Sequence, residues 1–425
     1  MSTLVLGLDV GGTSSRAVTT TLDGAVVGRG AAGGGNPLAV PPDLAAAEVA
    51  RALAAALAGT DPRRIAAAVL GLAGVSGFDR PETSAAFQRV WDAAGLQCPV
   101  AAVGDAQVAF ASGTDAPLGT VLIAGTGAAA ARIDADRITR VGDGLGWLLG
   151  DKGSGFWIGR RAAADTAASL QSGRPPTLLT HLVMQAVLDG GLGETETAAT
   201  HSVPTYPAVA ADATDTAAAD STSTDPAGAA GGHTGELDGG PDVTATAATD
   251  SISTDPASAA GTPGGGADRR WSEGTAGAAE VRAAGTRPGG LTADARRDSR
   301  AASDAFVIAV HQRPPRSLDR LAPLVTEAAL AGDEHAAAIL DEAAAHLAAA
   351  VASVRDAGEA TPIVLSGSVL RGSAPVRDGV RARLAAAWPG APVTEAGPAE
   401  LGAAKLAVLS LQRPSVAPFS TRPFS

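Results

Sequence analysis

A long segment of low sequence complexity limits how much of this chain can fold. From Gly190 to Asp304 the sequence is mostly Ala, Thr, Ser, Asp, Gly and Pro, without hydrophobic periodicity. Such segments bury too little apolar surface to offset the conformational entropy that ordering costs. We therefore expect residues 190–304 to be a disordered insertion, with a partner-binding or regulatory segment as the alternative. The packed parts are then residues 1–189 and 305–412, followed by a tail over 413–425.

Composition and charge exclude several classes of function. The sequence contains no run of eighteen bulky apolar residues, so we expect no membrane-spanning helix and no membrane partner. The net charge is −12 without a long basic run, which argues against nucleic acid as a partner. The single cysteine, Cys98, excludes an intrachain disulfide and a multi-cysteine metal site. The chain start lacks a basic region and meets an acid at Asp9, which is unlike a signal peptide and predicts a cytoplasmic protein.

Outside the insertion, the order strand, strand, helix, strand, helix occurs twice. The first set comprises a strand over 4–9, a hairpin over 18–30, a helix capped by Asp43 and ending near 57, a strand over 65–72, a helix over 83–94 and a strand over 100–103. The second set comprises a strand over 120–124, a hairpin over 132–141, helices over 156–170, 178–188, 317–330 and 334–354, a strand over 363–365 and a helix over 399–411. This repeat predicts two similar α/β lobes with their glycine turns at one cleft, where ligands bind in such folds.

Each lobe opens with an apolar strand that runs into a glycine turn carrying threonine. The first turn reads Asp9-Val-Gly11-Gly12-Thr13-Ser14, and the second reads Gly125-Thr126-Gly127. Glycines let backbone N–H groups approach a phosphate closely, and an acid beside the turn can hold Mg²⁺ through water. An ordinary tight turn is the alternative for either one alone. Two such turns in equivalent positions favour a nucleotide, because its phosphates need donors from both walls.

Two further strand ends could carry chemistry. Asp105 ends one expected strand and opens a helix, where its carboxylate could accept a proton from an attacking hydroxyl or could simply cap the helix. The turn Ser366-Gly367-Ser368 could place a glycine against a nucleobase or ribose, or it could be another strand-to-helix turn.

A glycine-rich stretch with one tryptophan lies between these two strand ends. It runs from Gly144 to Gly155 and includes Trp147, Gly150 and Asp151. A flat apolar wall beside a bidentate hydroxyl acceptor suits a sugar-sized pocket. The alternative is a turn followed by a capped helix.

The five stretches, in this order and spacing, resemble the sugar kinase/Hsp70/actin superfamily, and within it the N-acetylglucosamine kinases and BadF/BadG/BcrA/BcrD-type ATPases. The resemblance covers nearly all of the chain outside the insertion. It implies an α/β fold of two ribonuclease-H-like (actin-like ATPase) lobes around a central cleft. The N-terminal lobe would be residues 1–117, and the C-terminal lobe would be 118–189 with 305–412, whose final helix returns to the first lobe.

The resemblance also implies a function and roles for single residues. It implies an ATP-dependent, Mg²⁺-using kinase, a cytoplasmic homodimer, that phosphorylates the small-molecule amino sugar N-acetylglucosamine at its 6-hydroxyl. It assigns nucleotide binding to Gly11, Gly12, Thr13, Ser14, Thr126, Gly127, Gly367 and Ser368. It assigns the metal to Asp9, the catalytic base to Asp105, and sugar contacts to Asn36, Asp105, Trp147, Gly150 and Asp151.

One departure from the family pattern leaves the substrate open. Lys152 stands where the family usually has glutamate, and this reverses a charge beside the expected sugar pocket. The alternatives are a kinase for glucosamine or N-acetylmuramic acid, and a non-catalytic sugar- or nucleotide-binding regulator of the same fold. An ATPase that activates a reductase would need several cysteine thiolates for its iron–sulfur cluster, and Cys98 is alone.

Overall fold

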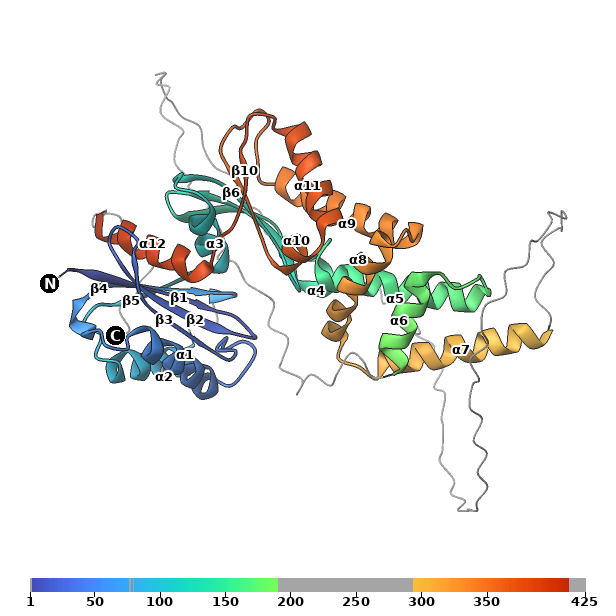
Figure 1. Ribbon diagram of the computed structural model, residues 1–425, viewed down its shortest axis with the longest axis horizontal. Helices are drawn as coiled ribbons and strands as arrows, with labels where there is room; N and C mark the ends of the chain where they lie inside the picture. The colour runs from blue at the N-terminus through green and yellow to red at the C-terminus, as the bar shows by residue number, and fades with distance from the viewer. Residues whose placement is uncertain (1, 76–77, 79, 190–292, 413–425) are drawn as a thin grey trace, which may run out of the picture. The chain divides into compact units, whose positions relative to one another are not determined.

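The computed structural model describes residues 2–75, 78, 80–189 and 293–412 (Figure 1). The first sheet contains β1 (Leu4–Val10), β2 (Ser15–Thr21), β3 (Val26–Ala32), β4 (Ile65–Leu72) and β5 (Val100–Gly104). The second contains β6 (Leu118–Ala124), β7 (Ala128–Asp134), β8 (Arg137–Asp143), β9 (Ile363–Ser366) and β10 (Val393–Glu395). Their orders, β3-β2-β1-β4-β5 and β8-β7-β6-β9-β10, follow one pattern. In each, three antiparallel strands are joined by two parallel ones, which confirms the expected pair of α/β lobes.

The first sheet is covered on both faces because β1 is apolar on both sides. Leu4, Leu6 and Leu8 pack with α1 (Pro42–Ala56) and α2 (Pro81–Ala93), whereas Val5 packs with α3 (Asp105–Gly113) and α12 (Ala399–Gln412). Side chains along a strand alternate between faces, so one continuous apolar strand serves two helical layers. The expected cap of the first helix is wrong. Its N-cap is Pro41, and Asp43 lies in the first turn, where it pairs with Arg89 at 2.8 Å.

The last helix, α12, lies on the N-terminal sheet although it ends the described chain (Figure 1). Two glycines allow this approach. A Cβ built on Gly7 of β1 would lie 2.2 Å from the Glu400 carbonyl oxygen, and one on Gly402 would lie 2.0 Å from that of Val108. Backbone-to-backbone contacts this short exclude any larger residue, so the glycines set the position of α12 against β1 and α3.

The helix α3 packs against both sheets. Val108 and Ala111 belong to the core of the first lobe, whereas Ala109 and Phe110 pack against residues of the second sheet. The side chain of Gln107 donates to the carbonyl of Asp136 in the turn between β7 and β8. The helix that begins at Asp105 is therefore held by contacts from both lobes.

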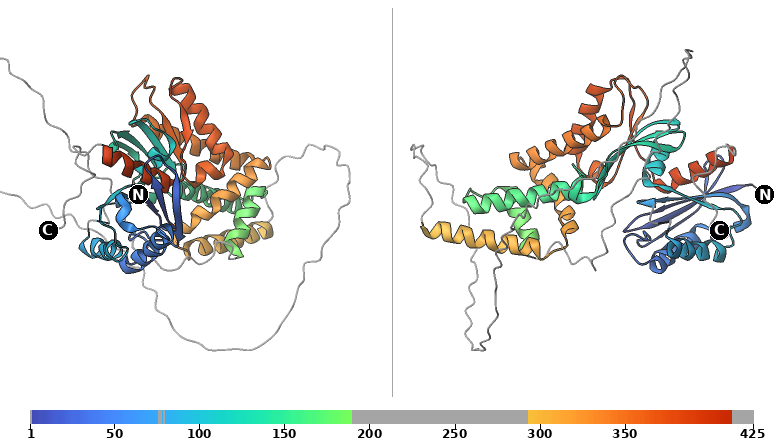
Figure 2. Two further views of the ribbon diagram at one scale, coloured as in Figure 1. Left: turned by 60° about the vertical axis from the view of Figure 1, so that its left-hand side comes forward. Right: turned by 180° about the vertical axis from the view of Figure 1, so that it is seen from behind.

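The second lobe carries most of the helices. They are α4 (Gly146–Leu149), α5 (Gly155–Ser172), α6 (Leu178–Leu188), α7 (Ala293–His311), α8 (Ala322–Leu330), α9 (Glu334–Ala352), α10 (Ser368–Gly372) and α11 (Ala374–Ala387). Two short 3₁₀ helices, η1 (Pro62–Arg64) and η3 (Pro315–Leu321), complete the described elements, η3 being in this lobe. Figures 1 and 2 show α5, α6 and α7 side by side, in agreement with their contacts. No helix in the described ranges has the length and hydropathy that crossing a bilayer requires.

The start of α7 corrects the expected boundary of the insertion. The helix begins at Ala293, inside the segment expected to be disordered up to Asp304. Phe306 is buried in the core of the second lobe, and Ala309 and Val310 pack beside it at helical spacing. This apolar stripe supplies the burial that the preceding sequence lacks. The rest of the expected insertion, 190–292, and the expected tail, 413–425, lie outside the described residues.

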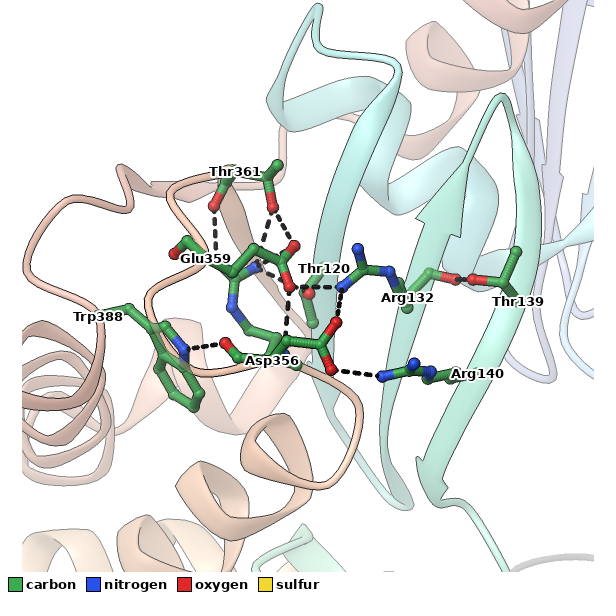
Figure 3. A network of polar contacts seen from close by, with 9 residues as sticks. Thr120, Arg132, Thr139, Arg140, Asp356, Glu359, Thr361 and Trp388 are labelled. Atoms are coloured by element: carbon green, nitrogen blue, oxygen red, sulfur yellow. Dashed lines mark hydrogen bonds and ion pairs between the residues drawn. The ribbon is translucent and has the colours of Figure 1, made fainter.

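A polar network joins the loop between α9 and β9 to the second sheet (Figure 3). We call it the Arg355 network, and its members are Thr120, Arg132, Arg140, Arg355, Asp356, Glu359 and Thr361. The buried guanidinium of Arg355 donates to the Thr120 hydroxyl at 2.9 Å and to the Thr361 carbonyl at 2.8 Å. Glu359 accepts from Arg132 and Thr361. Because Thr120 lies in β6 and Thr361 precedes β9, the network secures the strands that end at the two C-terminal-lobe turns.

Candidate active site

Asp105 lies where β5 ends and α3 begins. Gly104 is the N-cap residue, and its N–H donates to the Gln107 side chain at 2.9 Å. One carboxylate oxygen of Asp105 accepts from the Ala106 N–H at 2.9 Å. Gln107 thus completes the cap, and capping does not account for an acid at position 105.

Asp9 and Asp105 are two carboxyl groups whose ionisation is disfavoured. Burial raises the pKa of each to about 6, and the charge of Asp105 adds to the rise at Asp9. Arg16, with its guanidinium 3.9 Å from Asp9, offsets only part of this effect. A carboxyl with a pKa near 6 is ionised at neutral pH and still basic enough to accept a proton from a hydroxyl in a transition state.

The first glycine turn offers free backbone donors. The Gly11 N–H donates to the Ser14 carbonyl at 2.9 Å, whereas the N–H groups of Gly12, Thr13 and Ser14 have no acceptor among the described residues. A Cβ on Gly11 would meet only that carbonyl, at 3.6 Å, and one on Gly12 would meet only the Ala39 Cβ, at 3.8 Å. Packing therefore does not require these glycines. The space they leave beside open donors suits a phosphate.

The acid beside this turn fits a Mg²⁺ ion that is held mainly by phosphates and waters. Asp9 is the next-to-last residue of β1, directly before the turn, and the charge of its half-buried side chain is only partly balanced. The described residues contain no group of three or more His, Cys, Asp or Glu side chains placed to hold a metal ion. Mg²⁺ is commonly held by one or two carboxylates, waters and substrate phosphates rather than by a complete protein cage. Asp9 meets that lesser requirement.

A cavity of about 380 Å³ brings several predicted site residues together. Its lining includes Ala73 and Gly74 after β4, Asp105, the turn Gly125–Gly127, Trp147, Asp151 and Arg316. Trp147 is held edge-to-face against Phe156, with ring centroids 5.4 Å apart. The cavity therefore combines an acid, a glycine turn and an aromatic wall, a common composition for small-molecule sites.

Asp151 is held in the cavity wall by Asp143, which sequence reasoning missed. Asp151 is buried with φ near +54°, and its N–H donates to the Asp143 carboxylate at 2.7 Å. The Lys152 N–H donates to the other oxygen of Asp143 at 2.9 Å. Burial raises the pKa of Asp151, while the Ala128 and Gly146 N–H groups oppose the rise. The only local signal for Asp143 was its place before Gly144 at the end of a hairpin.

A second cavity, of about 180 Å³, also borders the Gly125–Gly127 turn, at Gly125 and Thr126. Its lining includes Thr126, Ser368 and Asp319, the last of which accepts a hydrogen bond from the Thr126 hydroxyl at 2.7 Å. The N–H groups of Thr126 and Gly127 have no acceptor among the described residues, so they remain available as donors. Gly367 has φ +106°, and a Cβ there would lie 2.1 Å from the Ala124 carbonyl oxygen, so only glycine fits before Ser368.

Some predicted residues lie outside the linings of these two cavities. They are Asp9, the first-turn residues Gly11 to Ser14, Asn36, Gly150 and Gly367. The buried Asn36 side chain donates to the Ala73 carbonyl at 3.1 Å and accepts from the Leu38 N–H at 2.9 Å, so it shapes the first cavity through Ala73. A Cβ on Gly150 would lie 2.2 Å from the Asp143 carboxylate, so this glycine permits the Asp143 contact. The exposed Lys152 does not line either cavity.

Parts of this chain are similar to known proteins. Residues 6–171 match the model of the BadF/BadG/BcrA/BcrD ATPase family. An N-acetyl-D-glucosamine kinase of Dictyostelium discoideum is 29% identical over 192 residues, which cover 43% of this chain and 60% of that protein. An N-acetylmuramic acid/N-acetylglucosamine kinase of Clostridium acetobutylicum is 32% identical over 107 residues, covering 25% of this chain and 35% of that protein.

These curated relatives are matched over less than two thirds of their own length. A solved structure from Chromobacterium violaceum, described as that of a proposed N-acetylglucosamine kinase, is 19% identical and has a TM-score of 0.56. The alignment covers 96% of this chain and 99% of that one. At this identity the likeness shows a common fold, in agreement with the strand order of the two sheets.

Proposed function

We propose that this chain is an ATP-dependent amino-sugar kinase. The proposal starts from the match of residues 6–171 to the model of the BadF/BadG/BcrA/BcrD ATPase family. The acceptor is N-acetylglucosamine and the reacting group is its 6-hydroxyl. One observation carries the proposal: Asp105, the second glycine turn, Trp147 and Asp151 line a single cavity. The names of the matched relatives support an amino sugar as the acceptor class.

Asp105 acts as the general base. Its carboxylate accepts the proton of the 6-hydroxyl as that oxygen attacks the γ-phosphorus of ATP. The bond between the γ-phosphorus and the bridging oxygen breaks, which yields the sugar 6-phosphate and ADP. A pKa of about 6 lets Asp105 take this proton at neutral pH without being permanently protonated.

The two glycine turns hold the phosphates in line with the acceptor. The first turn contributes the N–H groups of Gly12, Thr13 and Ser14, and the second contributes those of Thr126 and Gly127, none of which has an acceptor among the described residues. Phosphoryl transfer depends mainly on such positioning and on the stabilisation of charge. Mg²⁺ held near Asp9 supplies further neutralisation of the β- and γ-phosphate oxygens when it is bound.

The acceptor sugar lies between Trp147 and Asp151. The indole offers an apolar face, and the Asp151 carboxylate accepts hydrogen bonds from sugar hydroxyls. Asn36 and Gly150 support these walls through Ala73 and Asp143. Ser368, which lines the second cavity, contacts the adenosine together with Gly367 before it. From the family resemblance we further expect a cytoplasmic homodimer.

The test is sugar-dependent release of ADP. Purified protein is assayed with ATP and Mg²⁺ against N-acetylglucosamine, glucosamine, N-acetylmuramic acid and N-acetylmannosamine. We expect the highest kcat/KM with N-acetylglucosamine. Sugar binding without ADP release for all four would favour a non-catalytic regulator instead.

The Asp105→Asn variant tests the mechanism. It should lower kcat by about 10²- to 10⁴-fold while sugar and ATP binding stay within a few-fold of wild type, because the amide retains the shape but cannot take the proton. The matched control is Asp43→Asn, an exposed acid paired with Arg89 outside the site. Near-normal turnover in Asp105→Asn would exclude this residue as the base.

A further inference from the structure

The short helix η3 contributes a residue to each of the two cavities that border the second glycine turn. Asp319 accepts the hydrogen bond from Thr126 on the side of the smaller cavity. Arg316, one turn earlier, lines the larger cavity together with Asp105, Trp147 and Asp151. Neither residue was singled out by its local sequence. η3 is held against α5 by a close contact between Gly159 and the Leu318 carbonyl, where a Cβ would approach to 1.8 Å.

Arg316 is a solvent-exposed cation in the lining of this cavity, and its charge acts on Asp151 without forming an ion pair with it. Its side chain forms no hydrogen bond and no ion pair with another described residue, in contrast to Arg313 close by, which donates to the Val187 carbonyl at 2.7 Å. Arg316 and Asp151 both line the cavity without reaching ion-pair distance. A planar guanidinium with free N–H donors matches carboxylate and phosphate oxygens in pairs.

The place of Arg316 in the cavity indicates which part of a ligand it meets. Arg316 shares the lining of the cavity with Trp147 and Asp151, and its charge acts on Asp151. An anion bound by Arg316 therefore belongs to the acceptor, away from the transferred phosphoryl group. The acids Asp105 and Asp151 would repel an anionic acceptor, and a cation in the same lining offsets that repulsion.

We propose that Arg316 is a specificity-determining residue that binds an anionic substituent of the acceptor sugar, a carboxylate or a phosphate carried away from the reacting hydroxyl. The inference rests on the proposed function, since it concerns the same cavity. Trp147 and the exposed Leu148 beside it provide an apolar wall for the carbon atoms of such a substituent. The cavity then accepts both neutral and acidic amino sugars, and Arg316 sets the preference between them.

The experiment compares wild type with Arg316→Met, Arg316→Lys and the control Arg160→Met, an exposed arginine of α5 outside both cavities. Binding of three sugars is measured by calorimetry without ATP: N-acetylglucosamine, N-acetylmuramic acid and N-acetylglucosamine 1-phosphate. The second sugar carries a carboxylate and the third a phosphate, so they identify which anion is bound. The kcat/KM values for the same sugars and the KM for ATP are measured in parallel.

Arg316→Met should weaken the binding of the preferred acidic sugar by about 10- to 100-fold, as expected for loss of a hydrogen bond to a charged group. Binding of N-acetylglucosamine and the KM for ATP should change by less than about threefold. Arg316→Lys should fall between wild type and Arg316→Met, because it keeps the charge but loses the paired donors. Arg160→Met should bind all three sugars as wild type does.

Three results would overturn the inference. They are equal losses for neutral and acidic sugars, a raised KM for ATP as the main effect, and a wild type that binds neither acidic sugar more tightly than Arg316→Met does. Failure of the proposed function gives a different pattern, in which sugars bind selectively but no ADP is released. The binding measurements therefore test Arg316 whether or not the chain is a kinase.

Discussion

Charged side chains are withdrawn from water in two regions of this molecule. The regions differ in how far neighbouring groups compensate the buried charge. In the Arg355 network, buried charges are bonded to groups of opposite charge or to polar oxygens (Figure 3). Burial alone would raise the pKa of Glu359, yet its bonds to Thr361 and Arg132 hold that pKa below its usual range. At Asp9 and Asp105, burial prevails and both pKa values rise to about 6.

This difference separates a part that stabilises the fold from a part available for chemistry. Balanced buried charges are costly to disturb, since removing one leaves its partner uncompensated. A carboxyl group with a raised pKa is destabilised when ionised, and binding a proton, a cation or a substrate can relieve this destabilisation.

The largest effect on stability is expected at the centre of the network. Arg355→Met should lower the free energy of unfolding by about 3–5 kcal/mol, because Thr120 and the Glu359 and Thr361 carbonyls would lose a buried donor and Glu359 would lose one of its two cations. Urea denaturation at pH 7.5 measures the change. The control is Arg383→Met, which removes an exposed pair with Asp341 and should cost at most about 1 kcal/mol. Equal losses in the two variants would show that burial does not distinguish them.

At the candidate active site, a substitution is expected to increase the free energy of unfolding. Asp9→Asn should raise the free energy of unfolding at pH 7.5 by on the order of 1 to 3 kcal/mol while abolishing the proposed kinase activity. The Asp9 pKa is 3.8 unperturbed and about 6 when folded, so folding disfavours the ionised form. This cost is absent below pH 4, grows up to pH 6 and is constant above it.

The gain in Asp9→Asn should therefore vanish in urea titrations at pH 3.5. The exposed Asp43→Asn should show no such pH-dependent gain. A loss of stability at pH 7.5 in Asp9→Asn would mean that the carboxylate is better compensated than the contacts around it indicate.

The pH dependence of activity follows from the same two acids. Below about pH 6, kcat/KM for N-acetylglucosamine should fall about tenfold per pH unit, because Asp105 must be ionised to accept the proton. Asp9 lies near enough to couple to it, so the acid limb belongs to the pair rather than to one residue. Initial rates between pH 5 and 8 measure this limb, with Asp43→Asn as the control. A flat profile down to pH 5 would contradict the raised pKa values.

The smallest effect is expected at the edge of the network. Arg140 and Asp356 form an ion pair at 2.9 Å with their side chains 52% and 63% exposed, so solvent screens the pair. Arg140→Met should change the free energy of unfolding by less than about 1 kcal/mol. Urea denaturation of Arg140→Met beside Arg355→Met locates the energetic centre of the network. A loss as large as that of Arg355→Met would place it at the surface instead.

The local elements were predictable because their signals are local. Apolar runs followed by glycine turns marked β1 and β6, and the Asp23-Gly24 pair marked the hairpin of β2 and β3. Helix α11 and strand β10 were not anticipated. Helix α7 was hidden by its position, because its polar first turns continue the low-complexity composition before Phe306 begins the buried stripe.

The supporting residues of the site were less predictable. Asp143 and Asp319 contact Asp151 and Thr126 across 8 and 193 positions of sequence. Arg355 reaches Thr120 across 235 positions. An isolated acid or arginine in a helix or loop has no local pattern that distinguishes a support from a solvated side chain. Such roles arise only when packing selects the partner.

The sequence by itself determined the duplicated α/β lobe and the glycine turns, since hydrophobic periodicity and glycine conformation act over a few residues. It also indicated Asp105, because an acid between a strand and a helix is a local feature. Only the tertiary structure decided that Asp105, Trp147 and Asp151 share one cavity and that Arg316 joins them. Only folding sets how far each charge is desolvated and which partners it meets, and these two quantities separate the reactive acids from the stabilising ones.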